Sequence, residues 1–592
     1  MTALLLSACT STVPSRTAPA NPVASSTRLT AQESTTYYVD SASGLDGNSG
    51  TSSDAPWKTL EMVNGRSFAS GDVISFKRGS SFSGTILTLG SAGVTLNSYG
   101  SGDKPLFRNP GGLKVLEIAA GGVTVDGLAF TDTTTFSGTF ATVEYENSGA
   151  VRIAQGADSV TIRNSEFYGV GLGIKSYGNF TNISNNYFHD LKIAYRDSNQ
   201  SYGAVGISLN NSNAEVAYNT FLNCRSTDSP YGADGGAIEI EGFTNQKNNI
   251  YIHHNTSRNS QGFLEVTETS SSDVTLAYNL SDDYQHFLAF DTTTRPNNYK
   301  VEHNTVIRTR SDQAITVFAT LYYREVVASP SSSWLNVRNN IFYTPAAKVF
   351  RGTYSYSDFN YPHSNNLFYD GSSDPTGYGL GSGDLNAVPQ FVSSSDFRLT
   401  GASPAINAGA GLGYTFDLDG NGVPYGGAPD MGAYEYQSAP SSGGGSSNLI
   451  CNPGFESLSS LDSPWYTESG GSGYFGVDAG TGASRSGANN AWIFTSSNTW
   501  QAIKQNVSVS ANTDYTLSVW IRNSGNFSGG YFGAKATDGS VLGEATFGAA
   551  SDYTQYSVSF NSGSNTTVVL HTGYYGPGAD SWAQLDDWSL TQ

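Results

Sequence analysis

An asparagine recurs at the ends of short apolar segments through the middle of the chain. The positions are Asn164, Asn186, Asn219, Asn255, Asn279, Asn304, Asn340 and Asn366. Their successive spacings are 22, 33, 36, 24, 25, 36 and 26 residues, a base period in the low twenties that insertions lengthen. Such a period is typical of a solenoid in which each repeat forms one turn of a coiled sheet. Asn suits a corner because its side chain bonds backbone groups and tolerates a left-handed backbone. We therefore expect an all-β fold built around a parallel β-helix.

The composition agrees with many short strands and turns and few helices. The 592 residues include 67 Gly and only 14% charged residues, while 12% aromatic residues argue against a disordered chain. The net charge of −20 argues against nucleic acid or an anionic membrane surface as the main partner. It disfavours a strongly anionic polysaccharide only weakly, because a local basic groove can override the net charge.

The two ends of the repeat region carry recognisable motifs. It opens with Tyr37-Tyr-Val-Asp and Ala55-Pro-Trp, and it closes with Asp430-Met-Gly-Ala-Tyr-Glu. These motifs resemble secreted right-handed parallel β-helix (pectin-lyase-like) enzymes that act on polysaccharides. The resemblance covers residues 37–437 and implies that they form a right-handed β-helix catalytic domain. It does not identify the substrate.

An acidic strand lies within the repeats. In Ala-Ile-Glu239-Ile-Glu241 apolar and acidic residues alternate, the period-two pattern of a half-buried strand, so both carboxylates should face outward. One repeat later, Glu265 stands between two apolar residues. Glu241 and Glu265 each precede the asparagine of their repeat by 14 residues. We therefore expect these two to stack on neighbouring turns, about 4.8 Å apart.

Paired carboxyl groups are the machinery of glycoside hydrolysis, because one protonates the leaving oxygen while the other activates water or attacks carbon. Glu239 and Glu241 start about 6.5 Å apart along the strand, which favours inversion, whereas Glu241 with Glu265 would permit retention. Asp234, in the loop that enters the strand, is a further catalytic candidate and would serve as the general acid. Crowding should raise one pKa enough to keep a proton. The pattern favours a glycoside hydrolase; acids with only a structural role are the alternative.

Two insertions, residues 191–202 and 225–235, flank the acidic strand and lengthen the loops where a cleft would be built. Tyr202 and Tyr231 lie within them and are candidate substrate-binding residues. The preceding repeat has Gly206 and Ser208 where the acidic strand has its carboxylates. We expect these small residues to leave room for a sugar ring.

A polysaccharide lyase is the first alternative function. Elimination across a uronic acid needs a base and a cation or Ca²⁺ to neutralise the substrate carboxylate. His189, Lys192 and Arg196 lie in one segment that could supply both. In the hydrolase hypothesis these three would instead bind substrate hydroxyl or sulfate groups. An epimerase, which would share the lyase's base, and a non-catalytic glycan-binding surface protein are further alternatives.

Residues 438–447 have the Gly/Ser-rich composition of a flexible linker. Residues 448–592 open with Asn448-Leu-Ile-Cys-Asn-Pro-Gly-Phe and close with Gln584-Leu-Asp-Asp-Trp, and they resemble β-sandwich (jelly-roll) carbohydrate-binding modules. The resemblance implies that exposed rings stack on sugars. The candidates in loop-like surroundings are Trp465, Trp500, Tyr574 and Trp582. Trp520 and Trp588 alternate with apolar residues and are expected in the core.

Hydrolysis by carboxyl groups requires no cofactor, but two places offer ligands for a structural calcium ion. Asn452, Glu456 and Asp586 would tie the ends of the sandwich together. The run Asp417-Leu-Asp-Gly-Asn421 has the oxygen-ligand spacing of a calcium loop but lacks the terminal Glu of an EF-hand. An ordinary Asp/Gly turn is the alternative for this second place.

The first residues predict the location of the protein. Leu-Leu-Leu-Ser-Ala-Cys9 resembles the end of a bacterial lipoprotein signal peptide, whose cysteine is lipidated, although the charged n-region is missing. We assign residues 1–36 to a signal remnant and a Ser/Thr/Pro/Ala-rich tether. We expect an exported bacterial monomer that is extracellular or held at the cell surface. Its three cysteines lie too far apart to predict disulfides or a zinc site.

Overall fold

The computed structural model describes most of the chain from residue 34 onward. The described residues are 34–108, 114–132, 136–137, 148–196, 201–230, 232–242, 246–292, 296–310, 316–320, 334–350, 362–437, 449–450, 452–455, 461, 465–471, 473–479, 483–486, 489–527 and 529–592. Within them no helix is long and apolar enough to cross a membrane. Helix α1 (Leu60–Asn64) covers the first turns and buries Leu60 and Val63.

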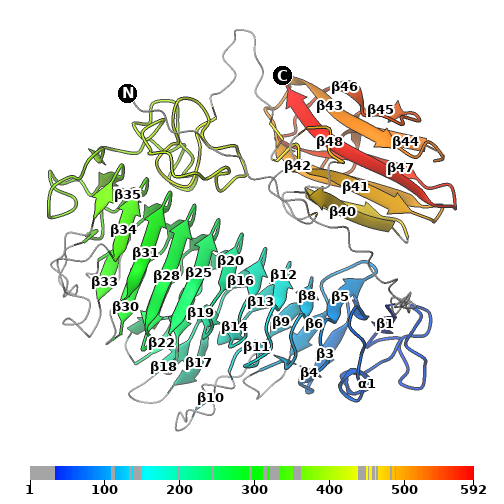
Figure 1. Cartoon of the computed structure of the whole chain (residues 1–592), viewed down its shortest axis with the longest axis horizontal. Helices are drawn as coiled ribbons and strands as arrows, with labels where there is room; N and C mark the ends of the chain where they lie inside the picture. Colours follow the sequence, from blue (N-terminus) through cyan, green and yellow to red (C-terminus); the bar gives the residue numbers. More distant parts are fainter. Residues whose placement is uncertain are drawn as a thin grey trace, which may run out of the picture.

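Three long parallel sheets, here called A, B and C, form the first part of the molecule (Figure 1). Sheet A consists of β1 (Thr36–Val39), β2 (Val73–Lys77), β5 (Thr95–Tyr99), β8 (Thr124–Asp126), β12 (Thr161–Arg163), β15 (Asn182–Ser184), β20 (Ala214–Ala217), β25 (Lys247–His253), β28 (Ser271–Ala277), β31 (Asn297–Glu302), β34 (Leu335–Arg338) and β36 (His363–Ser364). Sheet B consists of β3 (Ser81–Ser83), β6 (Leu106–Arg108), β9 (Ala129–Thr131), β13 (Glu166–Tyr168), β16 (Tyr187–His189), β21 (Thr220–Leu222), β26 (Thr256–Arg258), β29 (Leu280–Asp282), β32 (Thr305–Ile307), β35 (Ile341–Tyr343), β37 (Leu367–Tyr369) and β38 (Leu385–Asn386). Sheet C consists of β4 (Leu87–Leu89), β7 (Leu116–Ile118), β11 (Val151–Ile153), β14 (Leu172–Ser176), β19 (Val205–Leu209), β24 (Gly236–Glu241), β27 (Leu264–Thr267), β30 (Leu288–Asp291) and β33 (Phe318–Thr320).

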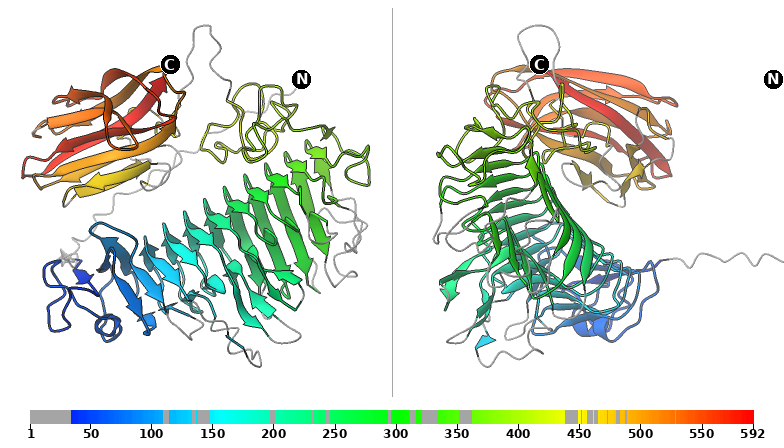
Figure 2. Two further views of the ribbon diagram at one scale, coloured as in Figure 1. Left: turned by 180° about the vertical axis from the view of Figure 1, so that it is seen from behind. Right: turned by 60° about the vertical axis from the view of Figure 1, so that its left-hand side comes forward.

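The chain visits the sheets in the order A, B, C and then returns to A one turn further along. For example, β25, β26 and β27 form one turn, and each pairs in parallel with the corresponding strand of the next turn, β28, β29 or β30. The views in Figure 2 show these strands stacked along one axis, from blue to green. The predicted parallel β-helix is confirmed.

The interior is filled by stacked side chains of the same type from successive turns. The rings of Phe130, Phe167, Phe188 and Phe221 on sheet B lie 5.1, 4.7 and 5.0 Å apart between consecutive centroids, with nearly parallel planes. The apolar positions of the short alternating segments supply this core, because residues two apart on a strand face the same side. Stacked rings bury large apolar areas and add specific ring contacts.

The recurrent asparagines form a buried ladder at the corner between sheets A and B. The side-chain oxygen of Asn255 accepts from the backbone N–H of Asn219 at 2.9 Å, and the Asn255 amide donates to the carbonyl of Val216 at 2.8 Å. The residue before each ladder position has a left-handed backbone, with φ of 55° at Tyr218 and 53° at His254. The predicted corner role of Asn is thereby confirmed.

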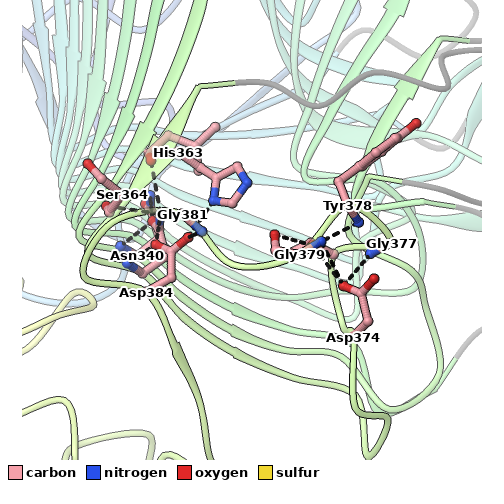
Figure 3. A network of polar contacts seen from close by, with 12 residues as sticks. Asn340, His363, Ser364, Asp374, Gly377, Tyr378, Gly379, Gly381 and Asp384 are labelled. Atoms are coloured by element: carbon pink, nitrogen blue, oxygen red, sulfur yellow. Dashed lines mark hydrogen bonds and ion pairs between the residues drawn. The ribbon is translucent and has the colours of Figure 1, made fainter.

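The alignment is wrong by one residue at the first repeat. Asn164 has φ of 52° and occupies the left-handed position, so the ladder position of that turn belongs to Ser165, whose N–H donates to Asn186 at 3.0 Å. At the other end the ladder stops on an aspartate: Asp384 accepts from the Asn366 N–H at 2.8 Å. Figure 3 shows Asp384 also contacting His363 and the backbone N–H of Gly381.

Two hairpins interrupt the repeat between sheets B and C. Strands β17 (Ile193–Arg196) and β18 (Ser201–Gly203) pair antiparallel, and β17 also pairs with β10 (Phe136–Ser137). In the next turn, β22 (Ser226–Ser229) and β23 (Gly232–Asp234) form the second hairpin. Figure 1 shows the labelled β17, β18 and β22 along the lower edge of the β-helix. They are the two predicted insertions, and they lead directly into β19 and β24.

The last segment forms a β-sandwich of two antiparallel sheets with its own core. The strands of sheet I are β39 (Trp465–Ser469), β42 (Trp500–Ser508), β44 (Gly529–Ala536), β45 (Val541–Phe547) and β47 (Thr567–Tyr575). The strands of sheet J are β40 (Gly473–Ala479), β41 (Asn489–Thr495), β43 (Asp514–Asn523), β46 (Thr554–Asn561) and β48 (Ser581–Thr591). Its buried side chains form one cluster, separate from that of the β-helix. This confirms the second half of the predicted fold class.

Candidate active site

Carboxyl side chains gather on the outer face of sheet C. Ser208 of β19, Glu239 of β24 and Glu265 of β27 are register partners on neighbouring strands. Since adjacent strands lie about 4.8 Å apart, these three side chains form one row across the sheet. Glu241 follows two residues after Glu239 and faces the same side. We call Asp234, Glu239, Glu241 and Glu265 the carboxyl cluster.

The predicted partner of Glu265 was Glu241, and this is wrong. Glu265 is opposite Glu239, and Glu241 is opposite Thr267. The cause is the connection after β24. Lys247 pairs with Ser271 on the next turn. Glu241 precedes Lys247 by six residues, whereas its partner Thr267 precedes Ser271 by only four. The two connections differ by two residues. Because side chains alternate between the faces of a strand, Glu241 still lies on the outer face but is shifted along the strand relative to Glu265.

Glu241 is surrounded by hydrogen-bond donors. Its Oε1 lies 3.1 Å from the ammonium of Lys175 and accepts a hydrogen bond of 2.8 Å from the Tyr202 hydroxyl. The Ser208 hydroxyl also donates to Oε1, and the Asn210 amide donates to Ser208 at 2.9 Å. Glu241 is only 1% exposed. A cation and two hydroxyl donors at one oxygen favour the ionised carboxylate.

Glu239 has the opposite surroundings. Its Oε2 is buried and has no hydrogen-bond partner among the described residues. Burial, followed by the charges of Glu241 and Glu265, raises the pKa of Glu239 well above its usual range. A carboxyl group in this position keeps its proton at neutral pH.

Glu265 also has the environment of a protonated carboxyl group. Burial, followed by the charges of Asp291, Asp234 and Glu241, raises the pKa of Glu265 to about 8. Nε2 of His286 lies 3.7 Å from its Oε2. Burial lowers the pKa of His286 to about 3, so the imidazole is neutral and supplies no charge to Glu265.

Asp234 reaches the cluster from the hairpin β22–β23 rather than from sheet C. Its carboxylate accepts from the Ser201 hydroxyl at 2.5 Å and from the N–H of Gly235 at 2.9 Å. Burial raises the pKa of Asp234, although these hydrogen bonds oppose the effect. Ser201 belongs to the other hairpin and also contacts Ser229 at 2.7 Å. The two insertions therefore meet beside the acidic strand.

The other site residues predicted in the β-helix do not all lie at the carboxyl cluster. Tyr202 lies at the cluster, where it binds Glu241. His189 lies on sheet B, stacks on the rings of Tyr168 and Tyr187, and contacts Glu166 and Asp190 instead. Burial lowers the pKa of Lys192, and the charge of Asp132 opposes that shift. Tyr231 and the side chain of Arg196 lie outside the described residues.

Gly206 does not open space beside the acids. A Cβ at this position would lie 2.6 Å from the ring of Phe221, so Gly206 faces the core. The position that adjoins the acids is Ser208. Sequence reasoning missed Lys175, which is the register partner of Ser208 on β14. An alignment of Gly173-Ile-Lys with Gly206-Ile-Ser and Ala237-Ile-Glu would have placed it in the row.

The aromatic candidates of the sandwich divide into buried and accessible rings. Trp465 is 1% exposed and donates to the carbonyl of Asn452 at 3.0 Å, and Tyr574 is 0% exposed. Both belong to the core, so their prediction as sugar-stacking rings is wrong. Trp582 is 38% exposed and Trp500 is half-buried, and both remain candidates. Trp588 lies in the core as predicted.

Trp520 is half-buried rather than in the core, and the guanidinium of Arg485 lies 3.7 Å from its ring centroid. The predicted core position is therefore only partly reached. The ring instead forms a cation–π contact at the surface of sheet J.

The calcium candidates are engaged in other contacts. Asp417 accepts from the backbone N–H groups of Asp419, Asn421 and Glu435, as in an Asp turn. Asp586 accepts from the N–H groups of Arg485 and Ser486. Glu456 lies outside the described residues. Among the residues that the structure does describe, no group of three or more His, Cys, Asp or Glu side chains could hold a metal ion. Calcium binding stays a prediction.

Cys9 and the rest of the predicted signal and tether also lie outside the described part of the chain. Export, lipid attachment and a monomeric state therefore stay predictions.

The class of protein follows from the fold and the site together: a parallel β-helix with a carboxyl cluster on one outer sheet face, followed by a β-sandwich. No family model matches the chain. Over 95 residues it is 40% identical to a lacto-N-biosidase of Bifidobacterium longum subsp. longum. This alignment covers 14% of the chain and only 6% of that relative's length.

Solved structures with similarity include a GH136 lacto-N-biosidase from Eubacterium ramulus, at 14% identity and a TM-score of 0.33, over 56% of this chain and 64% of that one. TmCBM61 in complex with β-1,4-galactotriose is similar at 18% identity and a TM-score of 0.22, over 25% of this chain and 99% of that one.

Proposed function

We propose that this protein is a glycoside hydrolase that acts on a neutral oligosaccharide or polysaccharide. The observation that carries the proposal is the contrast within the carboxyl cluster. Glu241 is held as a carboxylate by Lys175 and two hydroxyl groups, whereas Glu239 and Glu265 have the environments of protonated acids. Glycoside hydrolysis needs both forms side by side. The local similarity to a lacto-N-biosidase supports the same chemistry.

The roles follow from where each side chain originates. Glu241, on the sheet, supplies the carboxylate that attacks carbon or activates water. Asp234 comes from the hairpin rather than from the sheet, and burial raises its pKa, so we assign to it the donation of the proton to the leaving oxygen. Glu239 and Glu265, as protonated acids, donate hydrogen bonds to sugar oxygens.

A lyase fits this face less well. Elimination needs a cation that faces the substrate carboxylate. The charges of Lys175 and Lys247 are directed at Glu241 instead: the Lys175 ammonium lies 3.1 Å from its Oε1, and the charge of Glu241 opposes the lowering of the Lys247 pKa by burial. The carboxyl cluster, in which Glu239 and Glu265 are neutral and the charge of Glu241 is balanced by Lys175, also supplies no positive charge to hold an anionic sugar. The same two features favour a neutral glycan.

The proposed test is digestion of a panel of glycans by wild type, two site variants and one control variant. The panel contains 4-nitrophenyl glycosides of lacto-N-biose, galactose and N-acetylglucosamine, a set of neutral polysaccharides, polygalacturonate and alginate. New reducing ends and the ultraviolet absorbance of a new double bond are followed together. We expect reducing ends without that absorbance, and a loss of about 1,000-fold in Glu241→Gln.

Asp234→Asn tests the role of the general acid separately from that of the carboxylate Glu241. It should retain most activity on the nitrophenyl glycosides, whose leaving group departs without protonation, and lose activity on unactivated glycans. Glu117→Gln, an acid on β7 that is paired with Lys114 and Arg152, is the matched control and should behave as wild type. Rising absorbance on polygalacturonate or alginate would overturn the hydrolase and favour the lyase.

We further propose that the sandwich binds glycan through the outer face of sheet I. The ring of Trp500 lies 5.1 Å from that of Tyr575 and 6.1 Å from that of Tyr531. Gly573 lies between them, where a Cβ would come within 2.7 Å of the Trp500 ring. The glycine therefore keeps this aromatic surface open, and the Trp500 N–H is fixed by Glu468 at 2.8 Å.

A further inference from the structure

Lys175 lies beside the carboxyl cluster in the same row of sheet C, and it is closed off from solvent. It is on β14, two strands from Glu239 in the same row, and its side chain is 0% exposed. The ammonium reaches past Ser208 to Oε1 of Glu241 at 3.1 Å and lies 3.4 Å from the Tyr202 hydroxyl. It also lies 5.2 Å from the centroid of the Tyr202 ring. A substrate on the outer face cannot touch this ammonium.

We propose that Lys175 is a positioning residue for the reaction: it keeps Glu241 ionised and fixes the orientation of its carboxylate without contacting the sugar. The inference rests on the proposed hydrolase function. Three donors from three strands or hairpins, Lys175, Tyr202 and Ser208, converge on one oxygen of Glu241. Fixing Oε1 in this way fixes the plane of the carboxylate and the direction of its other oxygen.

A purely structural ion pair is the weaker explanation. Removing an ammonium completely from water is costly, and a buried ion pair contributes less to stability than apolar side chains of similar volume often do. Burial lowers the pKa of Lys175, and the charges of Glu241 and Glu239 oppose the shift. Other ion pairs on the same sheet, such as Lys114–Glu117, keep solvent contact at both partners. Lys175 is instead fully buried against Glu241 of the carboxyl cluster.

The ion pair of Lys175 and Glu241 also determines the charge of Glu239. With Glu241 held negative, a second negative charge two residues away on the same strand is unfavourable, and Glu239 retains its proton. Lys175 thereby separates one carboxylate from the protonated acids in a cluster of like groups. Without it, Glu241 would compete with Glu239 and Glu265 for protons, and the cluster would have no fixed carboxylate.

The test is the pH dependence of kcat/KM for Lys175→Met, measured on whichever nitrophenyl glycoside of the panel the wild type cleaves. We expect kcat to fall about 100-fold with little change in KM, because the misplaced group does not bind substrate. The acidic limb of the profile should move to higher pH by about one unit or more, because Glu241 loses the ammonium that is bound to its Oε1. Lys114→Met, which removes an ion pair elsewhere on the sheet, should leave both unchanged.

An acidic limb that stays in place in an active Lys175→Met variant would overturn the inference and leave the hydrolase intact. A wild type that cleaves nothing in the panel would instead overturn the hydrolase and the role of Lys175 with it.

Thermal unfolding tests the charge pairing without substrate and remains informative where the variant is poorly active. In Lys175→Met, the lowering of Tm should grow from pH 4 to pH 8, because Glu241 ionises in the unfolded chain, whereas in the folded one it has lost the ammonium bound to its Oε1 and keeps only the charge of Lys247. Glu241→Gln in the same background should remove this pH dependence. A loss of Tm that is equal at every pH would overturn the proposed pairing.

Discussion

At the scale of residues, the environment of Glu265 predicts an unusual effect of pH on stability. Its pKa is raised to about 8 in the folded protein, chiefly by burial. Below about pH 4 the group is protonated in both states and costs nothing. As pH rises toward 8 the unfolded chain ionises and the folded one does not, so the folded state loses stability. Glu265→Gln should therefore stabilise the protein increasingly over this range, by about 2 kcal/mol at pH 8 after allowance for the remaining solvent contact.

Urea unfolding at pH 4, 6 and 8 measures this effect. Glu117→Gln is the control, because it removes a carboxylate that is paired with Lys114 and Arg152 and should destabilise the protein rather than stabilise it. A Glu265→Gln variant that is equally stable relative to wild type at all three pH values would contradict the burial argument.

The residues of the site also differ in whether the sequence alone could predict them. Glu239 and Glu241 were predictable because the alternation of acidic and apolar residues is local to one strand. The register of Glu265 was not, because it depends on the length of a connection in another part of the turn. Lys175 was missed because its partner, Glu241, is 66 residues away in the chain. Only the stacking of three turns brings the two together.

At the scale of elements, the asparagine ladder predicts a large penalty for one amide. The Asn255 side chain is fully buried, and it bonds the carbonyls of Val216 and His253 and the backbone of Asn219. Asn255→Ala leaves these backbone groups without partners, which should destabilise the protein by about 3 kcal/mol or more. Asn182→Ala is the control, because that amide bonds Glu215 at the half-buried surface and should cost less than about 1 kcal/mol. Chemical unfolding of the two variants compares them, and equal losses would show that the ladder is not a stabilising element.

The elements themselves were predictable in kind but not in every boundary. The repeated asparagines indicated the corner, because an amide that bonds the turn before and the turn after must recur once per turn. Ser165 occupies the ladder position of one turn, and a hydroxyl there gives no signal in a search for asparagine. The hairpins were predicted only as insertions, since their short strands carry no alternating apolar pattern.

At the scale of the whole molecule, tertiary packing decided which tryptophans are accessible. Trp465 and Trp500 have similar Gly/Ser-rich neighbours in the sequence, but Trp465 packs against Phe455 and Trp588 in the sandwich core. The local sequence contains no information on the opposite sheet that buries one ring and not the other.

If the sandwich binds glycan as proposed, hydrolysis by the β-helix should depend on it only when the substrate is large. Binding of the sandwich to a long or insoluble glycan raises the local concentration of cleavable bonds, whereas a small aryl glycoside gains nothing. In the full chain, Trp500→Ala should weaken binding to an insoluble glycan by about tenfold, the loss expected from one stacked ring. Its kcat/KM on the nitrophenyl glycoside should be that of wild type. Pull-down isotherms and initial rates measure the two quantities on the same preparation. Trp582→Ala removes the accessible ring on sheet J and so distinguishes the two sheets of the sandwich. If binding were lost in Trp582→Ala but retained in Trp500→Ala, the glycan would be assigned to sheet J instead.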